Sequence, residues 1–172
     1  KELVSYLPKD QHMPSGPSQT AEMERVYDLV SGDNSKPYDM IELLKCIVDK
    51  DSLNESKALF GKPLITAYAK SGGIPVGVVA NQRILTTTGK GEVEIGGVIY
   101  ADSADKAARF IMDCNEMKIP LLFFQDVVGF MVGKAAEQSG IIKSGAKMVN
   151  AVSNSIVPKI TVVVGNYFGA GN

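Results

Sequence analysis

Two glycine-rich segments are the places in this sequence where chemistry could occur without a catalytic side chain. The first spans Gly129–Gly133 (Gly-Phe-Met-Val-Gly), and the second spans Gly165–Asn172 (Gly-Asn-Tyr-Phe-Gly-Ala-Gly-Asn). Residues without bulky side chains let a ligand approach backbone N–H groups closely. Two such groups aimed at one point form an oxyanion hole, which stabilises an enolate or a developing carbonyl anion. The same glycines are also compatible with tight turns that have no catalytic role.

The usual side-chain catalysts are few. His12 is the one histidine, and a lone histidine in an irregular segment is more often a bystander than a base. The sequence contains no HExxH, CxxC, G-x-S-x-G or P-loop pattern, which argues against metal and triad chemistry. Asp126 follows a predicted buried strand. It is either a catalytic carboxylate or a residue that caps the next turn or bonds to backbone amides.

The composition argues against several partner classes. With 172 residues and 45% hydrophobic residues, the chain is typical of a globular protein with one sizeable core. A net charge of -1 and dispersed lysines do not favour a nucleic-acid surface. No apolar run approaches the roughly 20 residues that span a bilayer. Cys46 and Cys114 lie in apolar helical patterns, so we expect buried thiols in a reducing compartment, the cytoplasm or a mitochondrial matrix.

The chain divides at about residue 36. Residues 1–36 show little sustained periodicity and predict a linker or arm, with one short helix near residues 21–30. Residues 37–172 predict one domain. Because the chain begins without Met and ends within a glycine-rich segment, we expect it to be a fragment.

The first part of the domain predicts a helix and a hairpin. Pro37 opens an amphipathic helix whose apolar residues recur at helical spacing. These residues are Met40, Leu43, Leu44, Ile47 and Val48. Two β-forming runs, residues 63–70 and 74–81, are joined by a Ser-Gly-Gly connection, which predicts a β-hairpin.

The second part predicts two helices and two buried strands. After a polar stretch at residues 82–97, Asp102 or Ser103 is the expected N-cap of the next helix. The apolar face of that helix comprises Ala107, Phe110, Ile111, Cys114 and Met117. Apolar runs at residues 119–124 and 159–164 predict strands buried between layers. A long helix at residues 135–155 joins them, with a buried face of Ile142, Ala146, Val149, Val152 and Ile156.

The element order predicts an α/β fold in which each later helix joins two buried strands by a right-handed crossover. Repeated ββα units occur in the crotonase superfamily and in simpler α/β folds, and the pattern alone does not choose between them.

At the glycine-rich segments the sequence resembles the C-terminal crotonase-like domain of acyl-CoA carboxyltransferases, the β subunits of biotin-dependent carboxylases. The similar stretches are residues 103–133 and 139–172, with the motifs G-F-M-V-G, G-I-x-K-x-G-A-K and F-G-A-G-N. Residues 38–49 and 77–81 look like the opening helix and first strand pair of that domain. The resemblance implies a crotonase-like fold over residues 37–172, incomplete at its C-terminus.

The resemblance leaves two aspects of the reaction open, namely the acyl group and the direction. The G-F-M-V-G and F-G-A-G-N forms look more like the methylcrotonoyl-CoA type than the propionyl-CoA type. However, Val127-Val128 stands where a Pro is common, and Asn166-Tyr167 stands where Gly-Ser is frequent. Glutaconyl-CoA and methylmalonyl-CoA decarboxylase subunits use a similar scaffold in the opposite direction.

The resemblance implies a mechanism that needs no side-chain base. Carboxybiotin releases CO2, and the resulting ureido anion removes the acidic proton of the acyl-CoA. Backbone amides of Ala170 and Gly171, with Gly169 as the hinge, are expected to hold the biotin ureido oxygen.

The first glycine-rich segment is expected to form the adjacent wall of the biotin site. Its residues are Gly129, Phe130, Met131, Val132 and Gly133, with apolar contact from Phe130 and Val132. Phe130 and Met131 are equally compatible with plain core positions.

The resemblance also implies partners. Biotin is carried on a biotin carboxyl carrier protein or domain that works with a biotin carboxylase component, and acyl-CoA is the substrate. We expect a homo-oligomer in which the N-terminal half of a neighbouring subunit supplies most of the CoA site, and no metal in this chain. The fragment alone is then expected to be inactive.

Two rival functions remain open. A stand-alone enoyl-CoA hydratase or isomerase requires a glutamate against the acyl carbons, and Glu137 is the one acidic residue closely following a glycine loop. A non-catalytic assembly subunit would use the same fold for oligomer contacts alone.

Overall fold

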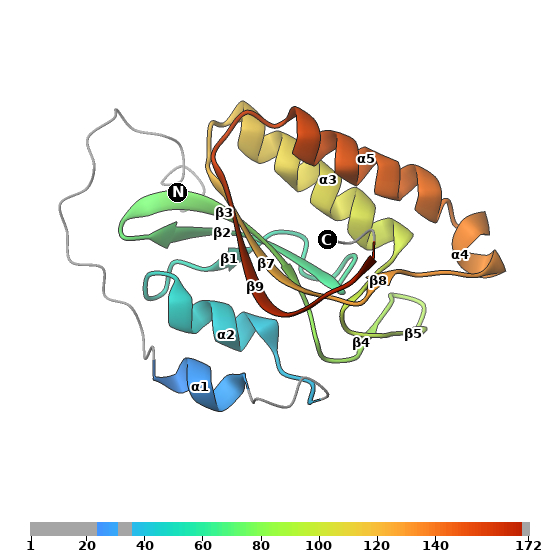
Figure 1. The fold of residues 1–172 in the computed structure, drawn as a ribbon, viewed down its shortest axis with the longest axis horizontal. Coiled ribbons are helices and arrows are strands. Elements are labelled where there is room, and N and C mark those ends of the chain that lie inside the picture. Colours follow the sequence, from blue (N-terminus) through green and yellow to red (C-terminus); the bar gives the residue numbers. More distant parts are fainter. Residues whose placement is uncertain (1–23, 31–35, 170–172) are drawn as a thin grey trace.

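A five-stranded sheet lies between helices on both of its faces, with α3 and α5 on one side and α2 on the other (Figure 1). The computed structural model describes residues 24–30 and 36–169. Most of the predicted arm, and the last three residues of the second glycine-rich segment, lie outside the described residues. Each face of the sheet has its own apolar core, one under α3 and α5 and one under α2.

The central sheet has the order β1-β2-β3-β7-β9. Its strands are Asn54–Glu55 (β1), Leu64–Ser71 (β2), Ile74–Asn81 (β3), Leu121–Val127 (β7) and Lys159–Tyr167 (β9). The first three strands are antiparallel, and β3, β7 and β9 are parallel. The predicted hairpin is therefore confirmed as β2–β3.

The hairpin turn depends on its two glycines. Gly72 and Gly73 have φ angles of +59° and +80°, the left-handed pair that a tight two-residue turn requires. The carboxylate of Asp49 accepts their N–H groups at 2.9 and 2.6 Å. The turn is thus fixed to the chain segment that follows α2.

The five helices of the described residues are short except for α3 and α5. They are Arg25–Leu29 (α1), Met40–Ile47 (α2), Ala101–Glu116 (α3), Lys134–Gln138 (α4) and Ile141–Asn154 (α5). Helix α1 lies within the predicted 21–30 segment and packs against α2 through Val26 and Leu29. Helix α2 begins later than Pro37, because the Asp39 carboxylate caps it by accepting the N–H of Ile41 at 2.9 Å.

Helix α3 confirms its predicted apolar face but not its predicted start. Phe110, Ile111 and Cys114 are buried under it, and both cysteines of the chain are free and buried. The expected N-cap at Asp102 or Ser103 is wrong. The N-cap residue is Tyr100, and its N–H donates to the Ser103 hydroxyl at 2.9 Å. Ser103 therefore lies inside the first turn and stabilises the helix start from there.

The predicted long helix at 135–155 is wrong in two respects. It breaks into α4 and α5 at Gly140, which has a left-handed φ of +88°. The predicted buried face is also largely turned outward, since Ile142 is 75% exposed, Val149 60% and Ile156 76%. The face that meets the core combines Ile141 with small residues, and the small residues allow α5 to pack closely along α3. The buried residues of α5 are Ile141, Ser144, Gly145 and Ala151.

Strands β7 and β9 are longer than their apolar runs. Strand β7 continues through Gln125 and Asp126 to Val127. Strand β9 continues to Tyr167, so the start of the second glycine-rich segment is strand rather than loop. The prediction that β9 is buried between layers is wrong, because in the described part of the chain β9 is the edge strand and most of its side chains are exposed.

Small strands organise the polar stretch at 82–97 and its surroundings. Thr86–Thr87 (β4) pairs with Val93–Glu94 (β5), and Val98–Ile99 (β6) pairs in parallel with Gly129–Phe130 (β8). The first glycine-rich segment is thereby fixed beside the start of α3. None of the helices in residues 24–30 and 36–169 is long and apolar enough to cross a membrane.

Candidate functional site

The two glycine-rich segments come together at the carboxyl ends of neighbouring strands. Strands β7 and β9 are parallel neighbours, with Val127 opposite Tyr167, so their carboxyl ends lie together. The N–H of Phe168 donates to the carbonyl of Val127 at 3.2 Å. Gly169 follows with a φ of +63°, a turn conformation that favours glycine. Ala170 and Gly171 lie outside the described residues, so their expected role stays a prediction.

The backbone of the first segment leaves two consecutive N–H groups available. The N–H of Val128 donates to Gly97 O at 2.8 Å, and that of Met131 donates to Ile99 O at 2.8 Å. Within the described part of the chain, the N–H groups of Val132 and Gly133 donate to no acceptor. Gly133 has a φ of +110°, which a side chain would strain. Fixed, unsatisfied amides are what an oxyanion site requires.

These amides border a cleft of about 890 Å³. Its walls are the loop 59–62, the β4–β5 hairpin, the start of α3, and the Met131–Gly133 part of the first glycine-rich segment with α4. Three of the five residues predicted for the biotin wall, Met131, Val132 and Gly133, line this cleft. Gly129 and Phe130 do not.

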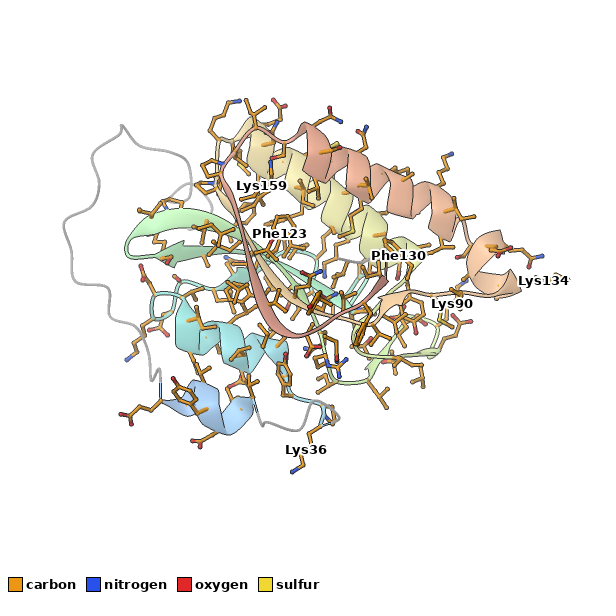
Figure 2. The ribbon with its side chains drawn as sticks, viewed as in Figure 1. Lys36, Lys90, Phe123, Phe130, Lys134 and Lys159 are labelled. Atoms are coloured by element: carbon orange, nitrogen blue, oxygen red, sulfur yellow. The ribbon has the colours of Figure 1, made fainter. Side chains whose placement is uncertain are left out.

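Phe130 lies on the other side of the segment, against the core. A Cβ atom at Gly145 would meet its ring at 3.0 Å, so α5 approaches the ring as closely as glycine allows. Phe130 also lines a second, apolar cavity of about 410 Å³, together with Phe123 and Met148. Figure 2 labels Phe123 and Phe130. Of the two roles considered for Phe130, this placement favours the core role.

The cleft is surrounded by charged residues, and the sequence patterns did not single these residues out. The cations are Lys62, Lys90 and Lys134, and the acids are Glu92, Glu94, Asp102 and Asp105. Figure 2 shows Lys90 and Lys134 on the same side of the molecule, beyond Phe130. They come from segments distant in sequence, so no local motif unites them.

Glu94 is the buried carboxyl group of the cleft. Its residue is 4% exposed, and it accepts the Thr86 hydroxyl proton at 3.3 Å. Burial, and then the nearby Asp102 carboxylate, raise the pKa of Glu94 above its usual value. Beside it, the Tyr100 hydroxyl accepts the N–H of Ile95 at 3.0 Å, so this wall of the cleft is held by polar contacts.

An ion pair between Lys106 and Glu55 lies outside the lining of the cleft. The Lys106 side chain on α3 is 0% exposed, and its Nζ lies 3.8 Å from Glu55 Oε1 on β1. Burial lowers the pKa of Lys106 and raises that of Glu55. The pair joins α3 to β1, close before the loop 59–62.

Asp126 lies at the junction of the two segments but lines neither cavity. It is 3% exposed and accepts the N–H of Asn166 at 2.8 Å. Tyr38 Oη lies 2.9 Å and Arg83 Nε 3.1 Å from its Oδ2. Burial and this carboxylate raise the pKa of Tyr38, so the phenol stays protonated and donates. Of the two roles considered, Asp126 has the one in which it bonds to a backbone amide.

Metal ligands, Glu137 and His12 are the other groups with which this sequence could do side-chain chemistry. Residues 24–30 and 36–169 contain no group of three His, Cys, Asp or Glu side chains that could hold a metal ion. Glu137, the residue required by a hydratase, is exposed on α4 and does not line the cleft. His12 lies outside the described residues.

Comparison with known proteins gives consistent matches. The family model of the carboxyl transferase domain matches residues 1–172. The biotin-dependent 3-methylcrotonyl-coenzyme A carboxylase beta1 subunit of Mycobacterium tuberculosis is 48% identical over 147 residues, which are 86% of this chain and 25% of the relative. The matched part of this chain thus spans only about a quarter of the length of these curated relatives.

Two solved structures share the fold. Transcarboxylase 12S, with methylmalonyl-coenzyme A and methylmalonic acid bound, superimposes with a TM-score of 0.80 at 36% identity, over 94% of this chain and 30% of that one. The geranyl-CoA carboxylase beta subunit of P. aeruginosa gives a TM-score of 0.78 at 34% identity, over 99% of this chain and 31% of that one.

Proposed function

This chain belongs to the carboxyl transferase domain family, and from that premise we propose that it forms the biotin-facing part of an acyl-CoA carboxyltransferase. The parent protein then moves a carboxyl group between carboxybiotin and an acyl-CoA. The observation that supports this most directly is the pair of available N–H groups at Val132 and Gly133, which line the cleft.

The fold agrees with the family. The expected crotonase-like α/β architecture is confirmed, because solved carboxyltransferases superimpose on nearly the whole chain. The division into an arm at 1–36 and a domain at 37–172 remains our proposal. It is supported by the packing of α1 on the outside of α2, away from the cleft.

The residues present suit a bound biotin. When bound, biotin supplies the carboxyl group and, after its release, a ureido nitrogen basic enough to accept the acidic proton of the acyl-CoA. The chain itself has to hold negative oxygen atoms and exclude water. Val132 and Gly133 offer N–H groups for one oxygen atom, and the turn at Gly169 leads into Ala170 and Gly171 for the biotin ureido oxygen. Met131 and Val132 provide apolar wall.

The thioester of the acyl-CoA becomes an enolate when its acidic proton is removed, and oxyanion stabilisation is then the main task of the protein. No side-chain base is needed in this scheme, which accounts for a cleft without histidine among its lining residues. The 48% identical relative is named for 3-methylcrotonyl-coenzyme A, so we propose this acyl group as the first to test.

We propose that the parent protein works with a biotin-carrying partner and as an oligomer. Transcarboxylase 12S assembles as a hexamer in a multienzyme core, and the biotin-dependent relative from M. tuberculosis is a beta1 subunit. In this arrangement the N-terminal half of a neighbouring subunit supplies most of the CoA site. A cytoplasmic or mitochondrial-matrix location fits these partners.

The deciding experiment measures acyl-CoA-dependent decarboxylation of carboxybiotin by the full-length parent. We expect turnover with 3-methylcrotonyl-CoA or another short acyl-CoA, and no turnover with any of them would contradict the proposal. Replacing Gly133 by Val strains a left-handed position and covers its N–H, so kcat should fall by about 100-fold, the usual effect of losing one oxyanion donor. Gly89→Ala, in the same cleft but without a positive φ or a close neighbour, is the matched control.

A further inference from the structure

We infer that Asp126 is a positioning residue that holds the two glycine-rich segments in register, an inference that rests on the proposed function. Asp126 stands three residues before Gly129, and its partner Asn166 stands three residues before Gly169. A single side chain therefore connects the starts of both segments.

The sheet is irregular at this place, and the Asp126 carboxylate compensates for it. The register between β7 and β9 pairs Gln125 with Val163 but Val127 with Tyr167, so two steps on β7 oppose four on β9. Such a bulge removes regular ladder partners. Asp126 Oδ1 replaces one of them by accepting the N–H of Asn166 at 2.8 Å, and it also accepts the Asn166 side-chain amide at 3.2 Å.

Gly165 in the bulge allows this contact. A Cβ atom there would meet the three terminal atoms of the Asp126 side chain at 2.5 to 2.7 Å. The carboxylate therefore occupies space that every other residue type at position 165 would fill. The first glycine of the second segment thus accommodates Asp126 rather than a ligand.

The other carboxylate oxygen connects to the first segment through Arg83. Arg83 Nε lies 3.1 Å from Asp126 Oδ2, and both side chains are nearly buried. The Arg83 guanidinium also packs on Gly97, where a Cβ atom would meet Nη1 at 2.5 Å. The carbonyl of Gly97 accepts the N–H of Val128, the residue before Gly129. A buried charge with these partners is costly to disturb.

Asp126 does not line the cleft, so it acts through the backbone of the two segments and not on a substrate. An error of about 1 Å in the placement of reacting groups can lower a rate by about 100-fold. The test therefore asks whether turnover depends on Asp126 more than folding does.

The experiment compares variants of the full-length parent in the carboxybiotin decarboxylation assay, below their melting temperatures. Asp126→Asn keeps the shape and one acceptor but removes the charge that holds Arg83. We expect kcat to fall by about 10- to 100-fold with KM for acyl-CoA changed less than about threefold. Asp113→Asn makes the same substitution at an exposed ion pair on α3 and should leave kcat unchanged.

The Tyr38→Phe variant distinguishes an effect on kcat from an effect on the stability of the fold. It removes one hydrogen bond to Asp126 but touches neither glycine-rich segment, so it should lower the melting temperature without a comparable loss of kcat. An Asp126→Asn protein with wild-type kcat, or equal kcat losses in Tyr38→Phe and Asp126→Asn, would overturn the inference.

Two further outcomes are informative. If Asp126→Asn does not fold, Arg83→Lys decides, because it keeps the charge but loses the packing on Gly97; a several-fold lower kcat supports the inference and an unchanged kcat overturns it. If the wild-type parent itself shows no turnover, the proposed function is wrong. The inference is then overturned as well, whatever the melting temperatures of the variants.

Discussion

At the scale of single residues, the contact between Gly165 and Asp126 shows how a glycine can be required by a neighbouring side chain. The carboxylate lies where a Cβ atom of residue 165 would be. Glycine motifs are usually explained by turns or ligand access, and both explanations were reasonable for this one. The deciding partner, Asp126, is remote in sequence, and a pattern search does not find such a contact.

Gly165→Ala should destabilise the protein by about 2 kcal/mol or more, because a methyl group displaces a buried, hydrogen-bonded carboxylate. Denaturant unfolding with and without the substitution measures this. Gly89→Ala is the control, since nothing lies within 4 Å of a Cβ at that position, and its change should stay within about 0.5 kcal/mol. Equal changes in the two variants would contradict the contact.

Glu94 gives a prediction on pH. Burial raises the pKa of its carboxyl group, so the folded protein binds this proton more tightly than the unfolded chain. The contribution of Glu94 to stability is therefore full below the ordinary glutamate value of 4.5 and is lost as pH rises through the folded pKa. Glu94→Gln does not titrate, so its unfolding free energy relative to wild type should increase between pH 4 and pH 7.

Unfolding curves at several pH values test the Glu94 prediction. Glu92→Gln makes the same substitution at an exposed neighbour and is the matched control for the loss of a carboxylate in this hairpin. A difference between Glu94→Gln and wild type that stays constant with pH would show that the carboxyl group is solvated in the folded protein.

At the scale of elements, α5 carries two overlapping apolar stripes, and the structure buries the one with smaller residues. Ser144 and Gly145 let α5 approach α3 and Phe130, which outweighs the larger apolar area of Ile142 and Val149. Helical periodicity shows that the helix is amphipathic. It does not show which of two adjacent stripes has a partner.

A matched pair of substitutions tests the rotation of α5. Ile141 is 5% exposed and Ile142 is 75% exposed, and they are adjacent on the same helix. Ile141→Ala should cost about 2 to 4 kcal/mol of unfolding free energy, and Ile142→Ala less than about 0.5 kcal/mol. Chemical denaturation measures both. The reverse order would mean that the predicted face is the buried one.

Elements that depend on residues close together in sequence could be predicted from the sequence. The β2–β3 hairpin follows from Gly72-Gly73, and the buried face of α3 follows from Phe110, Ile111 and Cys114. The first glycine-rich segment follows a strand as predicted, whereas the second begins inside strand β9. The cleft around Glu94 and Tyr100 was not predictable, because its walls come from segments distant in sequence that only the folded chain brings together.

The exposed edge strand has the same explanation. The apolar run at 159–164 is typical of a strand covered on both faces, yet Ile160 is 59% exposed and Val163 50%. The apolar run shows that both faces of the strand can pack against other elements. It does not show whether this chain supplies those elements.

At the scale of the whole molecule, apolar side chains gather on the outer face of α5 and along β9. Exposed apolar side chains and an open sheet edge both favour association. The exposed residues are Ile142, Val149, Ile156, Ile160, Val162, Val163, Tyr167 and Phe168. We therefore expect this 172-residue chain, when isolated, to self-associate through this surface.

Size-exclusion chromatography with light scattering at several concentrations tests the self-association. Ile160→Lys places a charge on the edge strand and should shift the mass toward the monomer. Val93→Lys is the control, because Val93 is 65% exposed on β5, away from this surface. A monomeric wild-type chain, or an equal effect of both lysines, would contradict the prediction.

The strand order of the central sheet has a consequence for the timing of folding. Because β1-β2-β3-β7-β9 is also the order of synthesis, each new strand joins the same growing edge. The hairpin can close within about 1–10 μs, whereas β7 and β9 each wait for a helical crossover. Asp126 obtains its Asn166 partner only when β9 docks. Within this chain, the β2–β3 hairpin can therefore form before the contact that joins the two glycine-rich segments.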